Sequence, residues 1–328
     1  METVRWGILA TGGIARRFVR AMEHVPGGTL HAVASRSAER AAEFASMAGA
    51  RRAYGTYEEL AADPDVDAVY VATPHPRHEP DTLMCIEAGK HVMCEKPFAL
   101  NAQQAERMIG AARHRGTFLM EAIWSRFLPA YARMGEVLAS GRIGEPVLVE
   151  ADFGFRAPFN PDHRLFAADL GGGALLDLGI YPLQLCSLVL GEPIGVSAQA
   201  VKGVTGVDEH VAAVVRYAGG LGVIKAATRV AMSCQARISG TEGWIGLPAF
   251  MHCPDHLTVT VGGETERIDA GFEGDGLQFE IIEAQRCLAA GLNESPGITL
   301  DQTLSLARTM DRIRAQIGVV YPGEEPLS

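Results

Sequence analysis

Two polar residues, Asp177 and Tyr181, stand four positions apart in a stretch, 175–190, that the sequence predicts to be helical. Side chains at positions i and i+4 share one face of a helix, so a carboxylate and a phenol would lie close together there. Oxidation of an alcohol needs a base that takes the hydroxyl proton while a hydride leaves the same carbon. The phenol of Tyr181 could be that base if a cation lowered its pKa from the ordinary value of about 10.

Lys96 is the candidate for this cation. It follows a predicted strand, 91–94, and precedes Pro97. Open α/β sheets bind their ligands at the carboxyl ends of parallel strands, so Lys96 would stand where a substrate binds. Asp177 would then orient Lys96 or a hydroxyl group of the substrate. We predict Lys96, Tyr181 and Asp177 as the catalytic residues, against the ordinary alternatives of a helix-turn carboxylate and a core aromatic residue.

A glycine-containing turn follows the first predicted strand. Aligned to the fingerprint Gly-x-Gly-x-x-Gly/Ala, residues 7–15 place Ala10, Gly12 and Ala15 at its three positions, so alanine replaces the first glycine. The free backbone N–H groups and the dipole of the following helix would favour a phosphate there. A plain connection between strand and helix is the alternative. The contacts predicted from this turn are Ala10, Thr11, Gly12, Gly13 and Ile14.

The second predicted strand, 29–35, indicates the type of cofactor. NAD-binding proteins carry a carboxylate at its end, where it binds the ribose 2′-hydroxyl. This chain has Ser35 and Arg36 there, with Arg40 one turn later, and no acid. A guanidinium can pair with a 2′-phosphate. We therefore predict NADP rather than NAD as the cofactor, with these three residues as contacts, while a solvated arginine at a strand end is the simpler alternative.

The elements that would position these residues fall into two regions. Strands are predicted at 4–9, 29–35, 68–72, 91–94 and 118–121, alternating with helices at 14–24, 38–47, 80–88 and 101–114. Such alternation is typical of a parallel sheet covered on both faces. Beyond residue 122 strand-like runs dominate, and several alternate apolar with polar residues. We predict an α/β Rossmann domain over 1–122 and an α+β domain over 123–328, with a large, mainly antiparallel open sheet that binds substrate and forms a dimer.

Composition excludes several classes of protein. The net charge of −10 over 328 residues argues against nucleic-acid binding. The most apolar stretch, 175–190, is shorter than the roughly 20 residues that a bilayer demands, so we expect no membrane span. Without a secretory signal, and with six scattered cysteines, the chain is expected in the cytoplasm. The histidine pairs His75/His78 and His252/His256 offer no third ligand nearby, so we predict no metal.

Several motifs resemble those of one protein family. The strongest are residues 5–8 (Arg-Trp-Gly-Ile), 57–60 (Tyr-Glu-Glu-Leu), 94–97 (Cys-Glu-Lys-Pro), 120–127 (Met-Glu-Ala-Ile-Trp-Ser-Arg-Phe) and 172–181 (Gly-Gly-Ala-Leu-Leu-Asp-Leu-Gly-Ile-Tyr). Through them the chain resembles, over nearly its whole length, the glucose/fructose oxidoreductase, inositol dehydrogenase and rhizopine catabolism (Gfo/Idh/MocA) family. The wider family commonly has histidine where this chain has Tyr181. The branch with dimeric dihydrodiol dehydrogenases and D-xylose dehydrogenases is similar to this chain in having tyrosine.

The resemblance extends the predicted site. We expect Thr73, Pro74, His75 and His78, after the strand at 68–72, to line the cofactor groove together with Lys96. The resemblance implies that Glu95 touches the nicotinamide side and that the Lys96–Pro97 peptide is cis. The residues expected around the substrate are Trp124, Phe153, Asp177, Tyr181, His252 and Phe272. His252 stands where the dihydrodiol branch has tryptophan, which would make this pocket more polar.

The function implied is hydride transfer between NAD(P) and the CH–OH group of a sugar, another polyol or a trans-dihydrodiol. A keto-sugar reductase using the same chemistry in reverse is one alternative. A non-catalytic NAD(P)-binding sensor is the other, although a sensor has no need of a base. The chain is expected to form a homodimer or a dimer of dimers through a face of the second-domain sheet that no predicted helix covers.

Overall fold

The computed structural model describes residues 3–324, which form two compact units. The first contains the chain up to Ala99 together with Gln103–Phe127 and Glu273–Leu304. The second contains Leu100–Ala102, Leu128–Phe272 and the chain from Ser305 onward. The single boundary that we place between residues 122 and 123 stays a prediction. A single boundary leaves the segment 273–304 in the second domain, whereas this segment packs with the first unit.

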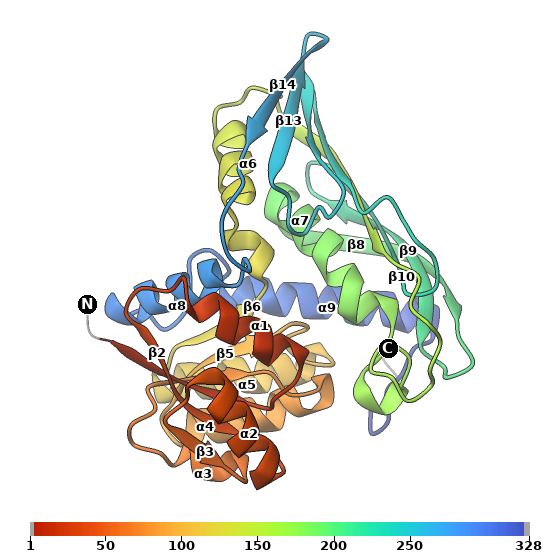
Figure 1. Cartoon of the computed structure of the whole chain (residues 1–328). Coiled ribbons are helices and arrows are strands. Elements are labelled where there is room, and N and C mark those ends of the chain that lie inside the picture. Colours follow the sequence, from red (N-terminus) through yellow and green to blue (C-terminus); the bar gives the residue numbers. More distant parts are fainter. Residues whose placement is uncertain (1–2, 325–328) are drawn as a thin grey trace. The chain divides into compact units, whose positions relative to one another are not determined.

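The first unit is built on a six-stranded parallel sheet in the order β3-β2-β1-β4-β5-β6 (Figure 1). Its strands are β1 Val4–Leu9, β2 Gly28–Ala34, β3 Arg52–Tyr54, β4 Ala68–Val71, β5 His91–Glu95 and β6 Leu119–Ala122. Its helices are α1 Gly13–Met22, α2 Ala38–Ala48, α3 Tyr57–Ala61, α4 His78–Glu87, α5 Ala102–Arg115 and α8 Gln278–Ala289. The strand order reverses between β1 and β4, which is where doubly wound sheets bind ligands. The predicted Rossmann domain is confirmed.

Large apolar side chains explain why this sheet is buried. The four residues of β4, Ala-Val-Tyr-Val, are all buried, as a parallel strand covered on both faces requires. Phe18 of α1 stacks on Tyr70 of β4 with ring centroids 4.2 Å apart. Trp6 of β1 meets Phe18 edge-on at 5.6 Å. These aromatic contacts join the first helix to the centre of the sheet and so fix the start of α1 relative to the strand ends.

The second unit contains an eight-stranded sheet in the order β14-β13-β12-β11-β7-β10-β9-β8. Its strands are β7 Pro146–Gly154, β8 Pro193–Lys202, β9 Asp208–Tyr217, β10 Leu221–Ala227, β11 Ala236–Gly240, β12 Gly243–Leu247, β13 His256–Val261 and β14 Glu264–Asp269. The central pair β7 and β10 is parallel, and the other neighbouring pairs are antiparallel. A mainly antiparallel sheet was expected, and the structure confirms it. The parallel central pair was not expected.

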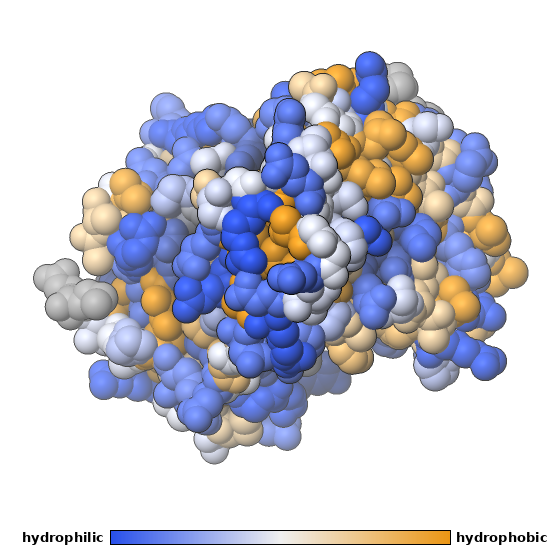
Figure 2. Space-filling view, turned by 90° about the horizontal axis from the view of Figure 1, so that it is seen from above, coloured by the Kyte–Doolittle hydropathy of each residue, from blue (hydrophilic) through white to orange (hydrophobic). Residues whose placement is uncertain are grey.

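Helix α7, Ile180–Leu190, covers one face of this sheet and contacts β7 and β10. Residues 211–217 of β9 alternate strictly between buried and exposed, so the other face is open. Apolar residues such as Val214 and Leu221 lie on that open side and are 41% and 43% exposed. Figure 2 shows apolar surface gathered in groups among hydrophilic residues on the face seen from above.

One stretch of the chain, Ala168–Leu190, is apolar and long enough to cross a bilayer by length and composition. In the structure 78% of its most apolar window is buried inside the protein. This burial is typical of a core helix, which α7 is. The remaining helices are α6 Pro129–Ala139 and α9 Leu300–Ile317, of which α9 begins in the first unit and ends in the second.

Candidate active site

The predicted cofactor residues lie directly after the carboxyl ends of neighbouring strands. Ala10 follows β1, Ser35 follows β2, and Lys96 follows β5. Thr73 comes two residues after the end of β4. Because parallel strands end on the same edge of a sheet, the topology brings all four segments to the edge where this fold binds ligands.

The turn between β1 and α1 has room for a ligand. Ala10 adopts φ = 78°, the left-handed conformation that the first glycine of the fingerprint would adopt with less strain. Gly12 and Gly13 are exposed, and a Cβ atom at either would have no heavy atom within 4 Å. Gly12 is also the N-cap of α1, so its neighbours present unpaired N–H groups outward. The backbone there fits a phosphate.

The predicted contacts for a 2′-phosphate also fit. Arg36 and Arg40 are both exposed, and neither guanidinium makes an ion pair within the described part of the chain. Ser35 is buried, and its N–H donates to the carbonyl of Tyr54 at 3.1 Å. Ser37 caps α2 by accepting the N–H of Arg40 at 3.3 Å. Two guanidinium groups are therefore available at the end of β2, and no carboxylate directly follows this strand.

His78 joins two turns of the candidate site. Its Nδ1 lies 2.8 Å from the carbonyl of Pro97, and its Nε2 lies 2.8 Å from the carbonyl of Thr73. The ring is fully buried, and burial lowers the pKa of the imidazole to about 4. In the neutral ring one nitrogen carries the hydrogen and donates to a carbonyl, while the other only lies near the second carbonyl, so His78 acts on the site through the two turns that it contacts. His75, buried beside it with ring centroids 5.6 Å apart, begins the short 3₁₀ turn His75–Arg77.

Two glutamate side chains bind backbone N–H groups on either side of the Lys96–Pro97 peptide. The Lys96–Pro97 peptide is cis, as the resemblance implies. The buried carboxylate of Glu95 accepts the N–H of Lys96 at 3.1 Å and the hydroxyl of Tyr70. Burial raises the pKa of Glu95, and the charge of Lys96 opposes this rise. On the far side of the turn, Glu121 accepts the N–H of Phe98 at 3.0 Å. Sequence reasoning did not single out Tyr70 or Glu121 for these roles.

Trp124 lies in the same unit, two residues after β6, and is buried. The guanidinium of Arg17 stacks over its indole ring at 4.8 Å and bonds to Asp275 at 2.8 Å. Asp275 belongs to the segment that returns to this unit late in the chain. The arrangement fixes the indole ring by a cation–π contact that local sequence patterns do not reveal.

Asp177 and Tyr181 lie on one continuous helical segment of the second unit. Asp177 is in a π-helical turn, Leu175–Gly179, and Tyr181 is in the first turn of α7. Both side chains are buried. Single π-helical turns within α-helices are frequent at functional sites. Asp177 pairs with Arg164 at 2.8 Å, a cation that the sequence analysis did not identify. The pairing of Asp177 with Lys96 stays a prediction.

Three of the predicted substrate residues form an aromatic cluster in this unit. Phe153 of β7 stacks on His252 with ring centroids 4.2 Å apart. Tyr181 meets Phe153 edge-on at 5.5 Å and lies 5.1 Å from His252. The exposed ring of Phe250, which the sequence analysis did not include, contacts His252 at 6.2 Å. Phe272 follows β14 and is half-buried.

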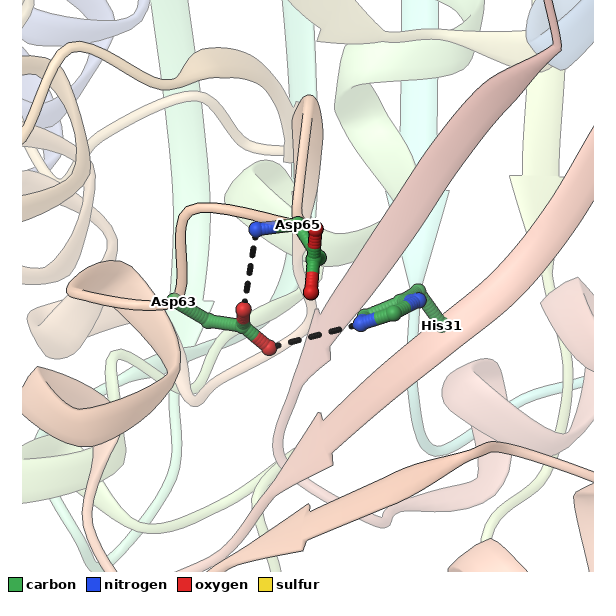
Figure 3. A group of neighbouring side chains, drawn as sticks. All are labelled: His31, Asp63 and Asp65. Atoms are coloured by element: carbon green, nitrogen blue, oxygen red, sulfur yellow. Dashed lines mark hydrogen bonds and ion pairs between the residues drawn. The ribbon is translucent and has the colours of Figure 1, made fainter.

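A group of possible metal ligands lies elsewhere, where His31 of β2 faces Asp63 and Asp65 (Figure 3). Its carboxylates are already neutralised. Arg52 binds Asp63 at 2.6 Å and Asp65 at 2.8 Å, and Arg5 binds Asp65 at 2.9 Å. Asp63 also accepts the backbone N–H of Asp65, at 2.9 Å. This is an ionic network at the amino-terminal side of the sheet, where two guanidinium groups bind three of the four carboxylate oxygens that a metal would need and the hydroxyl of Tyr54 donates to the fourth.

A Rossmann sheet with open glycine-turn backbone at its switch point, combined with a second sheet unit, defines the class of NAD(P)-binding oxidoreductases. Two family models match: "Oxidoreductase family, NAD-binding Rossmann fold" over residues 4–123, and "GFO/IDH/MocA C-terminal domain" over residues 131–246. The chain belongs to the Gfo/Idh/MocA oxidoreductase family.

Named relatives and solved structures agree with this membership. The trans-1,2-dihydrobenzene-1,2-diol dehydrogenase of Xenopus laevis is 39% identical over 331 residues, covering 97% of this chain and 99% of the relative. The enzyme of that name from Danio rerio is 40% identical over 330 residues, covering 97% and 98%. The 3-ketoreductase KijD10 of Actinomadura kijaniata, solved with NADP and TDP-benzene, has a TM-score of 0.86 at 28% identity, covering 96% and 98%. An aldose-aldose oxidoreductase from Caulobacter crescentus has a TM-score of 0.86 at 26% identity, covering 96% and 97%.

Proposed function

We propose that the chain is an NADP-dependent dehydrogenase that transfers a hydride between the cofactor and a CH–OH group of a sugar or a trans-dihydrodiol. The observation that carries the proposal is the position of Tyr181. Its phenol belongs to the first turn of a buried helix and packs against Phe153 and His252. Oxidation of an alcohol needs a positioned proton acceptor, and the two neighbouring rings hold the phenol of Tyr181 in place.

The chemistry needs a hydride carrier, a proton acceptor and a cation. Bound NADP supplies the acceptor or the donor of the hydride. Tyr181 takes the hydroxyl proton, and Lys96 supplies the positive charge that makes a phenolate accessible near neutral pH. Asp177, paired with Arg164, orients a substrate hydroxyl from the same helical segment. Glu95, Glu121 and His78 hold the backbone on both sides of Lys96 in place.

The residues that would hold the cofactor follow from the strand ends. The backbone from Ala10 to Ile14 would receive the pyrophosphate, and Ser35, Arg36 and Arg40 the 2′-phosphate. The segment from Thr73 to His75, together with Glu95 and Lys96, would line the nicotinamide side. Two solved neighbours, KijD10 with and without TDP-benzene, are complexes with NADP, which supports the same cofactor here.

Cofactor preference is testable through Arg36. Because Arg36 is exposed and makes no ion pair in the described structure, Arg36→Ala removes a charge without breaking an internal contact. A hydrogen bond to a charged group contributes about 1.5–3 kcal/mol, so we expect the Kd for NADP to rise by roughly 10- to 100-fold. The Kd for NAD should stay nearly constant. Fluorescence titration with both cofactors measures the two values.

The matched control for that experiment is Arg51→Ala. Arg51 is also an exposed arginine of the first unit, but it precedes β3 rather than following β2. It should leave both Kd values unchanged. Equal affinity of the unmodified protein for NADP and NAD would contradict the proposed preference.

The substrate is identified by assay. A panel of pentoses, hexoses, inositols and aryl trans-dihydrodiols, followed by absorbance of the reduced nicotinamide, separates a sugar dehydrogenase from a dihydrodiol dehydrogenase. Keto sugars assayed with NADPH test the reverse direction, which the similarity to a 3-ketoreductase favours as a second candidate. Cofactor binding without turnover on any member of the panel would instead support a non-catalytic sensor.

We propose further that the chain forms a homodimer through the open face of the second-unit sheet. Val214 and Leu221, on neighbouring strands of that face, are 41% and 43% exposed. Light scattering at micromolar concentration should give about 70 kDa, twice the 35.0 kDa of one chain. Val214→Lys should shift the mass toward the monomer, because a charge would be buried at the interface. Val204→Lys, in the turn after β8, should not. A monomer mass for the unmodified protein would refute the dimer.

The cytoplasm remains the proposed location. All six cysteines are free, and five of them are buried, which supports a reducing compartment.

A further inference from the structure

A buried carboxylate lies at the start of the helical segment that carries Asp177 and Tyr181. Asp208, the first residue of β9, has 0% exposure. Its Oδ2 accepts the backbone N–H of Leu175 at 2.7 Å. Leu175 begins the π-helical turn that contains Asp177. A side chain 33 residues away in sequence therefore caps this segment, whose own N-cap residue, Ala174, makes no side-chain cap.

The backbone around this cap is shaped for the contact. Gly173 has φ = 123°, which favours glycine, and a Cβ atom there would overlap Oδ1 of Asp208. The preceding carbonyl, of Gly172, accepts the hydroxyl of Tyr321 at 2.6 Å. Two distant segments thus hold the turn from Gly172 to Leu175, one at an N–H and one at a carbonyl.

Burial of the Asp208 carboxyl is unfavourable in free energy, so the contacts that offset this cost indicate the role of the residue. Burial raises the pKa of its carboxyl to about 7, against the lowering effects of the Leu175 and Ala174 N–H groups and of Arg314. Oδ1 has no hydrogen-bond partner in the described structure. An unpartnered polar atom in the interior lowers the stability of the fold. The hydrogen bond that Oδ2 accepts from the Leu175 N–H offsets part of this cost.

We infer that Asp208 is a positioning residue: by capping the turn at Leu175 it fixes the helical segment that places Asp177 and Tyr181. The inference rests on the proposed function of those two residues. It assigns Asp208 no contact with substrate or cofactor. Its effect reaches the reaction through the backbone, where a displacement of about 1 Å can reduce turnover by about 100-fold.

The test compares three variants. Asp208→Ala removes the cap, whereas Asp208→Asn keeps an oxygen that can accept the Leu175 N–H. Asp311→Ala is the matched control, because Asp311 is a half-buried aspartate that also accepts the N–H of the first residue of a helix, Ala102 of α5, at 2.8 Å. The three readouts are kcat, the Kd for NADP, and hydrogen exchange of the amides in residues 172–181.

For Asp208→Ala we expect exchange of the 172–181 amides to accelerate about 10-fold and kcat to fall at least about 10-fold, the scale of one lost hydrogen bond. The Kd for NADP should stay constant, since the residues proposed to bind it lie in the first unit. Asp208→Asn should restore both exchange and kcat, and Asp311→Ala should change neither. A role confined to stability would instead lower the melting temperature in both alanine variants alike and leave kcat unchanged.

Folded Asp208→Ala with the kcat of the unmodified protein, or Asp208→Asn as impaired as Asp208→Ala, would overturn the inference. If Asp208→Ala does not fold, Tyr321→Phe supplies the test. It removes the hydroxyl bonded to Gly172 and keeps the ring that packs on Arg314 at 4.4 Å, so both effects should appear in weaker form. Unchanged exchange and kcat in that variant would also overturn it. An unmodified protein that turns over no substrate contradicts the proposed function, while hydrogen exchange still reports on the cap.

Discussion

Replacing Tyr181 by phenylalanine should lower kcat by about 100- to 10,000-fold, the usual effect of removing a general acid or base. The substitution removes the phenol oxygen and leaves a ring of nearly the same shape. That ring can keep its edge-on contact with Phe153, at 5.5 Å, and its contact with His252, at 5.1 Å. The loss should therefore fall on chemistry, with the Kd for NADP and the melting temperature nearly unchanged.

Steady-state assays on the best substrate, with NADP titrations beside them, measure this effect. Tyr217→Phe is the matched control, because Tyr217 is also a buried tyrosine of the second unit and bonds to Ser187 of α7 at 3.1 Å. It should leave kcat unchanged. Asp177→Asn should reduce turnover by an intermediate factor, since it affects orientation. Near-normal turnover in Tyr181→Phe, with loss of activity in Asp177→Asn or His75→Ala, would show that another group takes the proton.

Lys96→Met should reduce kcat at least as strongly as Tyr181→Phe and should also change the pH dependence. A cation near a phenol favours the phenolate, so its removal makes the phenol harder to deprotonate. For alcohol oxidation the active form is the deprotonated base, which is populated above its pKa. The acidic limb of the pH–rate profile should therefore move to higher pH in Lys96→Met.

Lys96→Arg distinguishes charge from geometry. Arginine keeps the positive charge but presents it on a planar group of different shape. We expect it to keep the acidic limb near its original pH while recovering only part of kcat. A pH profile that is the same in Lys96→Met as in the unmodified protein would mean that Lys96 does not supply the charge.

Sequence patterns predicted the fold best where a run of apolar residues is followed directly by a turn. Buried strands such as β1 and β4 are apolar runs followed by turns, and the residues after the strand ends could be named from that pattern alone. Elements without an apolar period leave no such signal. β3 has three residues, of which the first two are exposed, and β14 carries mainly polar and exposed residues at the edge of its sheet. Charged edge strands resist aggregation but leave no alternation to detect.

The contacts that hold the site could not be predicted from the sequence, because they join segments that are far apart in the chain. The pair of Asp177 with Arg164, the two carbonyls on His78 and the cap of Asp208 on Leu175 depend on how loops fold over the sheet. The parallel pairing of β7 with β10 is of the same kind, since each strand has an ordinary alternating pattern and only the topology makes them neighbours.

The residues of the aromatic cluster should differ in how readily they tolerate substitution. Tyr181 lies on α7, which packs on the central strands β7 and β10, so a substitution near it disturbs the core. His252 and the exposed Phe250 lie in the connection between β12 and β13, outside the regular elements. Loops tolerate replacement far better than packed helices. Mutational libraries at the exposed and half-buried positions of this connection, Phe250 and His252 among them, should therefore yield enzymes with altered substrate range and unchanged proton chemistry, and natural lineages of this fold could diversify by the same route.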